Sequence, residues 1–247
     1  IELIEKDDIP KYLLFLENVF PYMDNYNYQK GMKEIIQELK NFLKPKDIGT
    51  DSDRALLLDF QATLEIKPEK AIKLEKDALA QIENITADNA RLVSNLHANL
   101  DGLYRMNGHP DLAREHMEKS ISLLDQFNLL HINDSIPQIA NYAMFLTEQQ
   151  EPERGISELQ KLSGIIKEYH SDDCLDYAKV QETLGTIYLM TANLPQAKTH
   201  FKRAFKIYEK IWADEPEMIE AKYQEIQELY PQIGFCIGKN LSGLLTK

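Results

Sequence analysis

Apolar residues along the chain recur three or four positions apart, and the segments with this spacing come in pairs. Such spacing places apolar side chains on one face of a helix. It predicts first helices over roughly 52–65, 88–107, 135–149 and 172–192, and second helices over roughly 68–84, 110–128, 152–169 and 195–213. Similar stripes flank them over 10–43 and from 215 to about 230. The pattern therefore predicts an all-α protein.

The paired segments repeat with a period of 42 residues. The clearest copy is LGTIYLMTANLPQAKTHFKRAF, residues 184–205, which has small residues at Gly185, Ala197 and Ala204. In the three preceding copies, each 42 residues earlier, the position of Gly185 is occupied by Ala143, Asp101 and Asp59. The position of Ala197 is occupied by Gly155, Ala113 and Ala71. A fixed period of this size is typical of stacked helical units that bury a continuous core together.

Prolines follow the same period. Pro68, Pro110 and Pro152 are 42 residues apart, and Pro195 comes one residue late. Proline is well tolerated in the first turn of a helix, where its missing N–H would be unpaired anyway. Each proline therefore predicts the start of a second helix.

Polar residues before the first helices are candidate N-caps. These are Ser52, Asp88, Ser135 and Ser171, and Ser135 with Gln138 has the spacing of a capping box. Within a pair, the small residues should let the two helix axes approach closely. Gly185 is expected to face Ala197 and Ala204.

These positions resemble the tetratricopeptide repeat. Six consensus positions are matched by Leu184, Gly185, Tyr188, Ala197, Phe201 and Ala204. The usual period of that family is 34, and the 42-residue form is similar to the repeats of kinesin light chain and of many bacterial signalling proteins. The stretch NLDGLYRMNGHPDLA, residues 99–113, resembles that subgroup closely. Asp101 and Glu75 depart from it, because a small residue and an aromatic residue are usual there.

The resemblance implies a right-handed α-solenoid, a superhelix of antiparallel helix pairs. The whole chain, 1–247, is expected to form one such solenoid, with repeats at 52–93, 94–135, 136–177 and 178–219. A divergent helix pair is expected at 10–51, and a capping helix or half-repeat at 220–247.

Composition narrows the classes of molecule that the chain is expected to bind. The net charge is −12 and no basic run is longer than two residues, which disfavours binding to nucleic acid or to anionic membranes. The two cysteines, Cys174 and Cys236, are far apart and are read as reduced thiols of a cytoplasmic protein. The chain begins at Ile1 without methionine, which suggests a piece of a longer protein.

Catalytic chemistry is not indicated. The sequence has no HExxH or GxSxG pattern, and GFCIGKN, residues 234–240, follows no predicted strand and is read as helix capping or packing. The histidines show no i, i+4 pairing, and Asp172 and Asp173 oppose thiolate formation at Cys174. The expectation is a non-enzymatic protein with no cofactor and no metal.

The resemblance also implies where a ligand would bind, because the first helix of each unit lines the concave groove in that family. The residues carried over as binding candidates are Asn95, Asn99, Arg105, Met106, Asn141, Met144, Glu148, Lys179, Glu182, Thr186 and Met190. Asn99 and Asn141 occupy the same position of consecutive units, where a carboxamide could hold the backbone of an extended peptide. The alternative is that these asparagines bridge neighbouring helices. The methionines offer an adaptable apolar surface, or else pack between repeats.

The leading hypothesis is a scaffold that binds a protein or peptide segment in the groove, as the sensor or interaction region of a larger bacterial regulator. One alternative is a peptide-pheromone-type receptor whose curvature changes on binding. The other is a structural solenoid that self-associates as a homodimer through an end or its convex face, which an apolar surface from Trp212 to Phe235 would favour. The sequence does not identify the partner.

Overall fold

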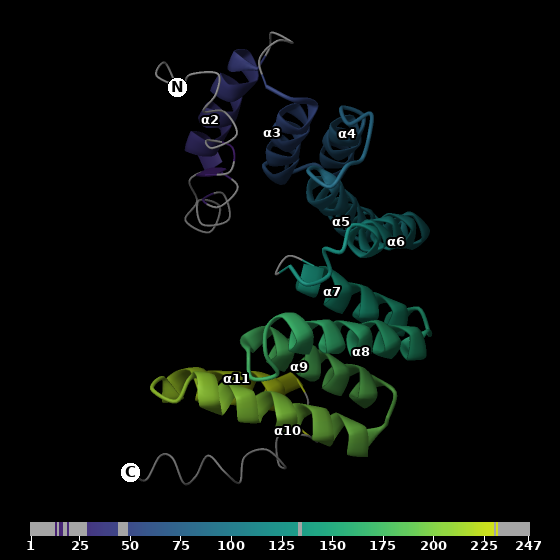
Figure 1. The fold of residues 1–247 in the computed structure, drawn as a ribbon, viewed down its shortest axis with the longest axis vertical. Helices are drawn as coiled ribbons and strands as arrows, with labels where there is room; N and C mark the ends of the chain where they lie inside the picture. The colour runs from purple at the N-terminus through teal and green to yellow at the C-terminus, as the bar shows by residue number, and fades with distance from the viewer. Residues whose placement is uncertain are drawn as a thin grey trace. The chain divides into compact units, whose positions relative to one another are not determined.

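The computed structural model describes residues 13, 15, 16, 19, 29–43, 49–132, 135–229 and 231. Every regular element in those ranges is a helix, and ten helices, α2 to α11, follow one another along the chain (Figure 1). None of the helices in these ranges is long and apolar enough to cross a membrane. The chain divides into two compact units, Ile1–Asn128 and Leu129–Lys247. The all-α prediction is confirmed.

Unit 1 contains α2 (Gln29–Phe42), α3 (Asp51–Thr63), α4 (Pro68–Leu79), α5 (Ala90–Met106) and α6 (Pro110–Gln126). The helices pair as α3 with α4 and α5 with α6, while α2 packs on α3 and α5 contacts both α3 and α4. Apolar side chains of α2 and α3, among them Met32, Ile36, Leu39 and Phe60, form one core cluster. A second cluster joins Ile72 to Leu100, Tyr104 and Ala113.

Unit 2 contains α7 (Ser135–Glu148), α8 (Pro152–Tyr169), α9 (Leu175–Met190), α10 (Leu194–Ile211) and α11 (Pro216–Leu229). The pairs are α7 with α8 and α9 with α10, and α9 also packs against both helices of the preceding pair. Helix α11 contacts α10. Side chains such as Leu146, Leu159 and Phe201 are fully buried. The eight predicted helices of the four repeats are thus confirmed, with ends displaced by a few residues.

The proline prediction is confirmed, and the late proline has a structural reason. Pro68, Pro110 and Pro152 are the first residues of α4, α6 and α8. Helix α10 begins one residue before its proline, at Leu194, and Asn193 caps it by accepting a hydrogen bond from the Gln196 N–H at 3.4 Å. Pro195 therefore still lies in the first turn.

Two predicted caps of the first helices are wrong by two or three residues. Thr50, not Ser52, caps α3: its hydroxyl accepts from the Asp53 N–H at 3.1 Å, while the Asp53 carboxylate accepts from the Thr50 N–H at 2.6 Å. Helix α9 is capped by Cys174, whose Sγ accepts from the Tyr177 N–H at 3.4 Å. The predicted cap Ser171 instead accepts from the Asp173 N–H in the preceding turn.

The other two cap predictions also need correction. Asn89, not Asp88, immediately precedes α5, and its side chain accepts from the Thr86 N–H rather than from the helix. Ser135 lies inside α7, and its hydroxyl donates to the Leu130 and Ile132 carbonyls. Ser135 therefore anchors the preceding turn.

The turn inside three of the helix pairs repeats with the sequence period. Its left-handed residue is Gly108 (φ 76°), Gln150 (φ 64°) and Ala192 (φ 58°), each 42 residues after the last. The residue that follows donates its N–H to a carbonyl five residues earlier: His109 to Tyr104, Glu151 to Leu146 and Asn193 to Tyr188, at 2.7–2.9 Å. This pattern is that of a Schellman motif, which satisfies the last carbonyls of a helix.

Small residues bring the helices of a pair into close contact. A Cβ atom added to Gly155 would lie 2.5 Å from the carbonyl oxygen of Ala143, so the backbones of α7 and α8 nearly touch there. A Cβ added to Gly185 would lie 2.9 Å from the Phe201 ring. The nearest neighbour of Gly185 is thus Phe201, and not the predicted Ala197 or Ala204.

We predict that Ala192→Gly stabilises the protein by about 1 kcal/mol, because glycine adopts positive φ without the Cβ penalty. Thermal unfolding followed by circular dichroism measures the change. The control is Lys202→Gly, an exposed position within α10, where glycine should destabilise by about 1 kcal/mol. A lower melting temperature for Ala192→Gly would contradict the assignment of the turn.

Candidate binding face of the first helices

The predicted binding residues lie on the first helix of each pair. In unit 2, α7 and α9 contact each other directly, and so do α3 and α5 in unit 1. Asn141, Met144 and Glu148 recur at helical spacing on α7, as do Lys179, Glu182, Thr186 and Met190 on α9. Side chains at such spacing share one face of their helix. We call these seven residues the unit 2 stripe.

Asn99 bridges three helices of unit 1. Its Nδ2 group donates to Asp59 Oδ1 on α3 at 2.8 Å and lies 3.4 Å from Glu75 Oε1 on α4. Asn99 thus bridges neighbouring helices, which was the alternative to a role in binding peptide backbone. Asn141, at the same repeat position in unit 2, is exposed and has no hydrogen bond to the described residues. The two asparagines therefore have different surroundings.

The acid pair beneath Asn99 is the most unusual contact of unit 1. Glu75 is only 2% exposed and occupies the repeat position of Phe201, while Asp59 occupies that of Gly185. Burial, followed by the charge of Asp59, raises the pKa of Glu75 to about 10. Glu75 is therefore neutral at pH 7, and one of its oxygens, Oε2, is buried without a partner in the described structure.

Arg105 is held by an acid at the next small-residue position. Asp101 is 1% exposed, and its Oδ2 atom lies 2.8 Å from the Arg105 Nη2 atom. Burial raises the pKa of Asp101, although the guanidinium of Arg105 opposes that rise. Met106, another predicted binding residue of unit 1, is 79% exposed.

Glu182 joins three helices of unit 2. Tyr208 on α10 donates its hydroxyl to Glu182 Oε2 at 2.6 Å, and Lys222 Nζ on α11 lies 2.9 Å from Glu182 Oε1. Burial and the Glu182 charge raise the pKa of Tyr208, and the neighbouring carboxylates raise that of Lys222 despite its burial. Thr186 donates its hydroxyl to the Glu182 carbonyl at 3.1 Å. Glu182 thus anchors α11, which the sequence did not predict.

The rest of the unit 2 stripe is open to solvent to differing degrees. Asn141, Glu148, Lys179 and Met190 are exposed, Met190 by 47%, and Met144 is half-buried. Their side chains make no hydrogen bond or ion pair within the described ranges. The stripe therefore exposes an amide, a thioether and charges of both signs, beside the half-buried thioether of Met144.

Histidine contacts were missed by the sequence reasoning, although the signal was present. His97 and His116 meet in unit 1 with their Nδ1 atoms 2.8 Å apart, and 84 residues later Gln181 and His200 meet at 2.9 Å in unit 2. Since 84 is twice the repeat period, an alignment of repeats two and four matches His116 with His200 and places His97 at the position of Gln181. The histidines and Gln181 are packing residues in both units.

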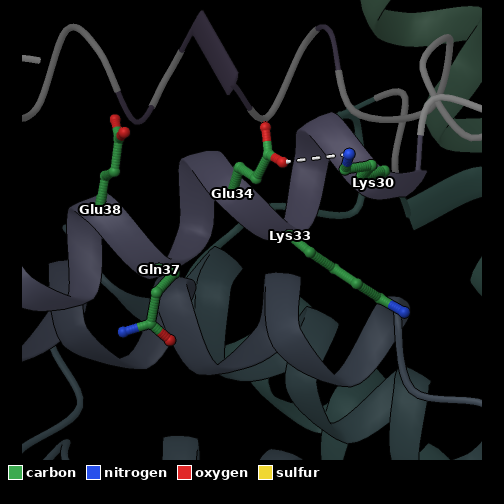
Figure 2. A pocket seen from close by; sticks show the side chains of 5 residues that line it. All are labelled: Lys30, Lys33, Glu34, Gln37 and Glu38. Atoms are coloured by element: carbon green, nitrogen blue, oxygen red, sulfur yellow. Dashed lines mark ion pairs between the residues drawn. The ribbon is translucent and has the colours of Figure 1, made fainter.

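Two hollows lie beside α2. The first has a volume of about 670 Å³, and the described residues that line it belong to α2: Lys30, Lys33, Glu34, Gln37 and Glu38. Figure 2 shows these side chains, with Lys30 paired to Glu34 at 3.9 Å. The second, about 290 Å³, lies among α2, α3 and α4 and is lined partly by Ile36, Leu64 and Ile66. Among the described residues that line them, neither hollow presents a nucleophile beside a base. Across the described ranges, no three His, Cys, Asp or Glu side chains are arranged to hold a metal ion.

Comparison with known proteins supports the repeat assignment. A family model described as tetratricopeptide repeat matches residues 135–210. No curated protein matches the sequence. Among solved structures, BtubC (BKLC) from P. vanneervenii aligns with a TM-score of 0.67 and 16% identity, over 88% of this chain and 89% of that one. Two structures of putative kinesin light chain repeats from Podosopora anserina also align, each at 13% identity. The first has a TM-score of 0.62 over 82% of this chain and 98% of that one. The second has a TM-score of 0.60 over 79% of this chain and 96% of that one. These likenesses establish the kinesin-light-chain-like solenoid fold.

We predict that Glu75→Gln stabilises unit 1 at alkaline pH. The pKa of Glu75 is raised in the folded state, so folding takes up a proton and stability falls as pH rises from about 4.5 toward about 10. Glutamine needs no proton, and the gain at pH 8 should be at least about 1 kcal/mol. Hydrogen exchange of α3–α5 at pH 5 and pH 8 measures it. Glu83→Gln, at an exposed position, is the control, and equal effects of the two variants would contradict the buried acid pair.

We also predict that the two asparagines respond differently to alanine. Asn99→Ala removes the donor of Asp59 and Glu75 and should cost about 1–3 kcal/mol. Asn141→Ala alters an exposed position and should change stability by less than about 0.5 kcal/mol. Urea unfolding of each single variant tests this difference, and equal losses would show that both asparagines bridge helices.

Proposed function

We propose, on the premise that residues 135–210 are tetratricopeptide repeats, that this protein is a non-enzymatic scaffold that binds a segment of another protein along α7 and α9. Repeats of this family generally support protein–protein interaction. The observation that carries the proposal is the unit 2 stripe. Its exposed members Asn141, Lys179 and Met190 lie within the matched repeats and are not used by packing.

The chemistry of the stripe suits an extended segment. The Asn141 amide carries a donor and an acceptor, so it can bind a peptide group of any sequence. Met144 and Met190 offer flexible, polarisable contacts for apolar side chains. Lys179 adds a positive charge that attracts a carboxylate of the ligand. Such a site would tolerate several sequences and select mainly for an extended backbone with apolar side chains.

Three finer proposals follow from the same premise. The scaffold would act in the cytoplasm as the sensor or interaction region of a larger regulator, in which binding is relayed to other domains. A peptide receptor whose helix stack changes curvature is the runner-up. Self-association is the third, and its proposed surface includes Phe235, which lies outside the described residues, as do GFCIGKN and Cys236. Light scattering at high protein concentration separates a monomeric scaffold from a self-associating solenoid.

We predict that charge placed on the stripe abolishes ligand binding without unfolding the protein. Peptides of twelve random residues displayed on phage are selected against the protein, and enriched peptides are then measured by fluorescence polarisation. Met144→Glu combined with Met190→Glu should weaken their binding at least about tenfold, since two apolar contacts are lost.

The matched control is Ile211→Glu, which places the same charge at an exposed apolar residue of the second helix α10, 40% exposed. It should leave the affinity of the selected peptides unchanged. If the stripe variant binds these peptides as tightly as the wild type, or if Ile211→Glu alone abolishes binding, the α7–α9 face is not the site.

A further inference from the structure

His97 on α5 and His116 on α6 form a contact whose geometry makes it sensitive to protonation. Their Nδ1 atoms are 2.8 Å apart. A hydrogen bond between two imidazole nitrogens needs one nitrogen that carries a hydrogen and one with a lone pair. When both rings are protonated, both nitrogens are donors and the rings repel. The contact therefore exists only while at least one ring is neutral.

The matching contact in unit 2 lacks this property. His200 Nδ1 lies 2.9 Å from Gln181 Oε1, at positions 84 residues after His116 and His97. Both histidines stack on a tyrosine of the first helix, His116 on Tyr104 at 5.4 Å and His200 on Tyr188 at 5.2 Å. The amide oxygen of glutamine accepts a hydrogen bond from a neutral or a protonated imidazole. The Gln181–His200 hydrogen bond thus survives protonation of the histidine, although burial, followed by the charge of Arg203, lowers the pKa of His200.

The surroundings of the histidine pair favour its neutral form. His116 is 9% exposed. Lys119 on α6 and Lys76 on α4 repel a positive charge there, while Glu115 on α6 attracts one. The Lys76 ammonium lies 5.6 Å from the Tyr104 ring, and the His109 ring lies 6.2 Å from that tyrosine. From α3 and α4, Asp59 and Glu75 face α5 at Asn99. Burial, then the neighbouring charges, lowers the pKa of His97 to about 4 and that of His116 below its usual range.

We propose that His97 and His116 form a proton-sensitive latch, which holds α5 against α6 while at least one ring is neutral and releases α5 when both rings are protonated. Helix α5 carries Asn95, Asn99, Arg105 and Met106, so release alters the first-helix surface of unit 1. The latch is independent of the peptide-binding role proposed for unit 2. It would make one unit of the solenoid acid-sensitive.

The direction of the effect follows from linkage. The unfolded chain binds a proton at His97 near pH 6.5, and the folded chain does so only near a pKa of about 4. Stability from this contact is therefore complete above pH 6.5, falls as the pH drops toward 4, and then stays constant. After allowance for partial solvent exposure of the ring, the opening equilibrium constant of the α5–α6 pair should rise at least about tenfold across that window.

The test substitutes His97→Gln, which copies the Gln181–His200 contact into unit 1. Hydrogen exchange of α5 and α6 is measured from pH 7 to pH 4 and corrected for the intrinsic exchange rate. Between pH 7 and pH 4, the protection factor of the wild type should fall at least about tenfold further than that of the variant. His109→Gln is the matched control: it makes the same change in the turn of the same unit and should keep the wild-type pH dependence.

Equal pH dependence of the wild type and His97→Gln would overturn the latch. If the variant does not fold, nitrogen-15 spectra of the wild-type imidazoles decide instead. The latch requires a single Nδ1-bound hydrogen shared by His97 and His116 at pH 7, and its loss together with α5–α6 protection at low pH. Two rings that titrate independently near pH 6.5 would refute the proposal.

Discussion

The close approach of two helices within each pair is the constraint on which the rest of this structure depends. In unit 2 it is met by small residues: the backbone of Ala143 faces Gly155, and Gly185 faces the Phe201 ring. An added methyl group at either glycine would enter the space of its neighbour. The turns that join the paired helices recur with the 42-residue period, at Gly108, Gln150 and Ala192. The position of the proposed binding face is thus a consequence of packing on the opposite side of the same helices.

Unit 1 meets the same constraint with polar groups. At the glycine positions it has Asp59 and Asp101, which contact Asn99 and Arg105 respectively. Glu75 replaces the aromatic residue and is kept neutral by burial. Glu75 favours the folded state at low pH, whereas the histidine pair favours it at high pH. The opposite signs give unit 1 a pH dependence of stability with a maximum.

Periodicity and proline were sufficient to predict the helices, because both act locally and repeat with the same period. Helix caps were harder, since Thr50 and Ser52 are equally good caps in isolation and only the backbone path decides between them. Long-range polar contacts could not be predicted: Asn99 meets an acid 40 residues away, and Glu182 meets a lysine on α11. The buried acid pair was visible only as a departure from the family pattern at Glu75. The histidine pair was readable from the repeat period but not from helical spacing.

Equivalence of position in a repeat is therefore not equivalence of role. Asn99 and Asn141 occupy the same place, yet Asp59 and Glu75 accept hydrogen bonds from Asn99, while the exposed side chain of Asn141 makes no hydrogen bond within the described residues. A side chain is available to a ligand only where the neighbouring helices do not already bind it. In unit 2, Glu182 is held by Tyr208 and Lys222, whereas Asn141 and Met190 are exposed and could contact a partner, as proposed above. The binding face proposed for this chain thus depends on which side chains of the first helices are already held by neighbouring helices.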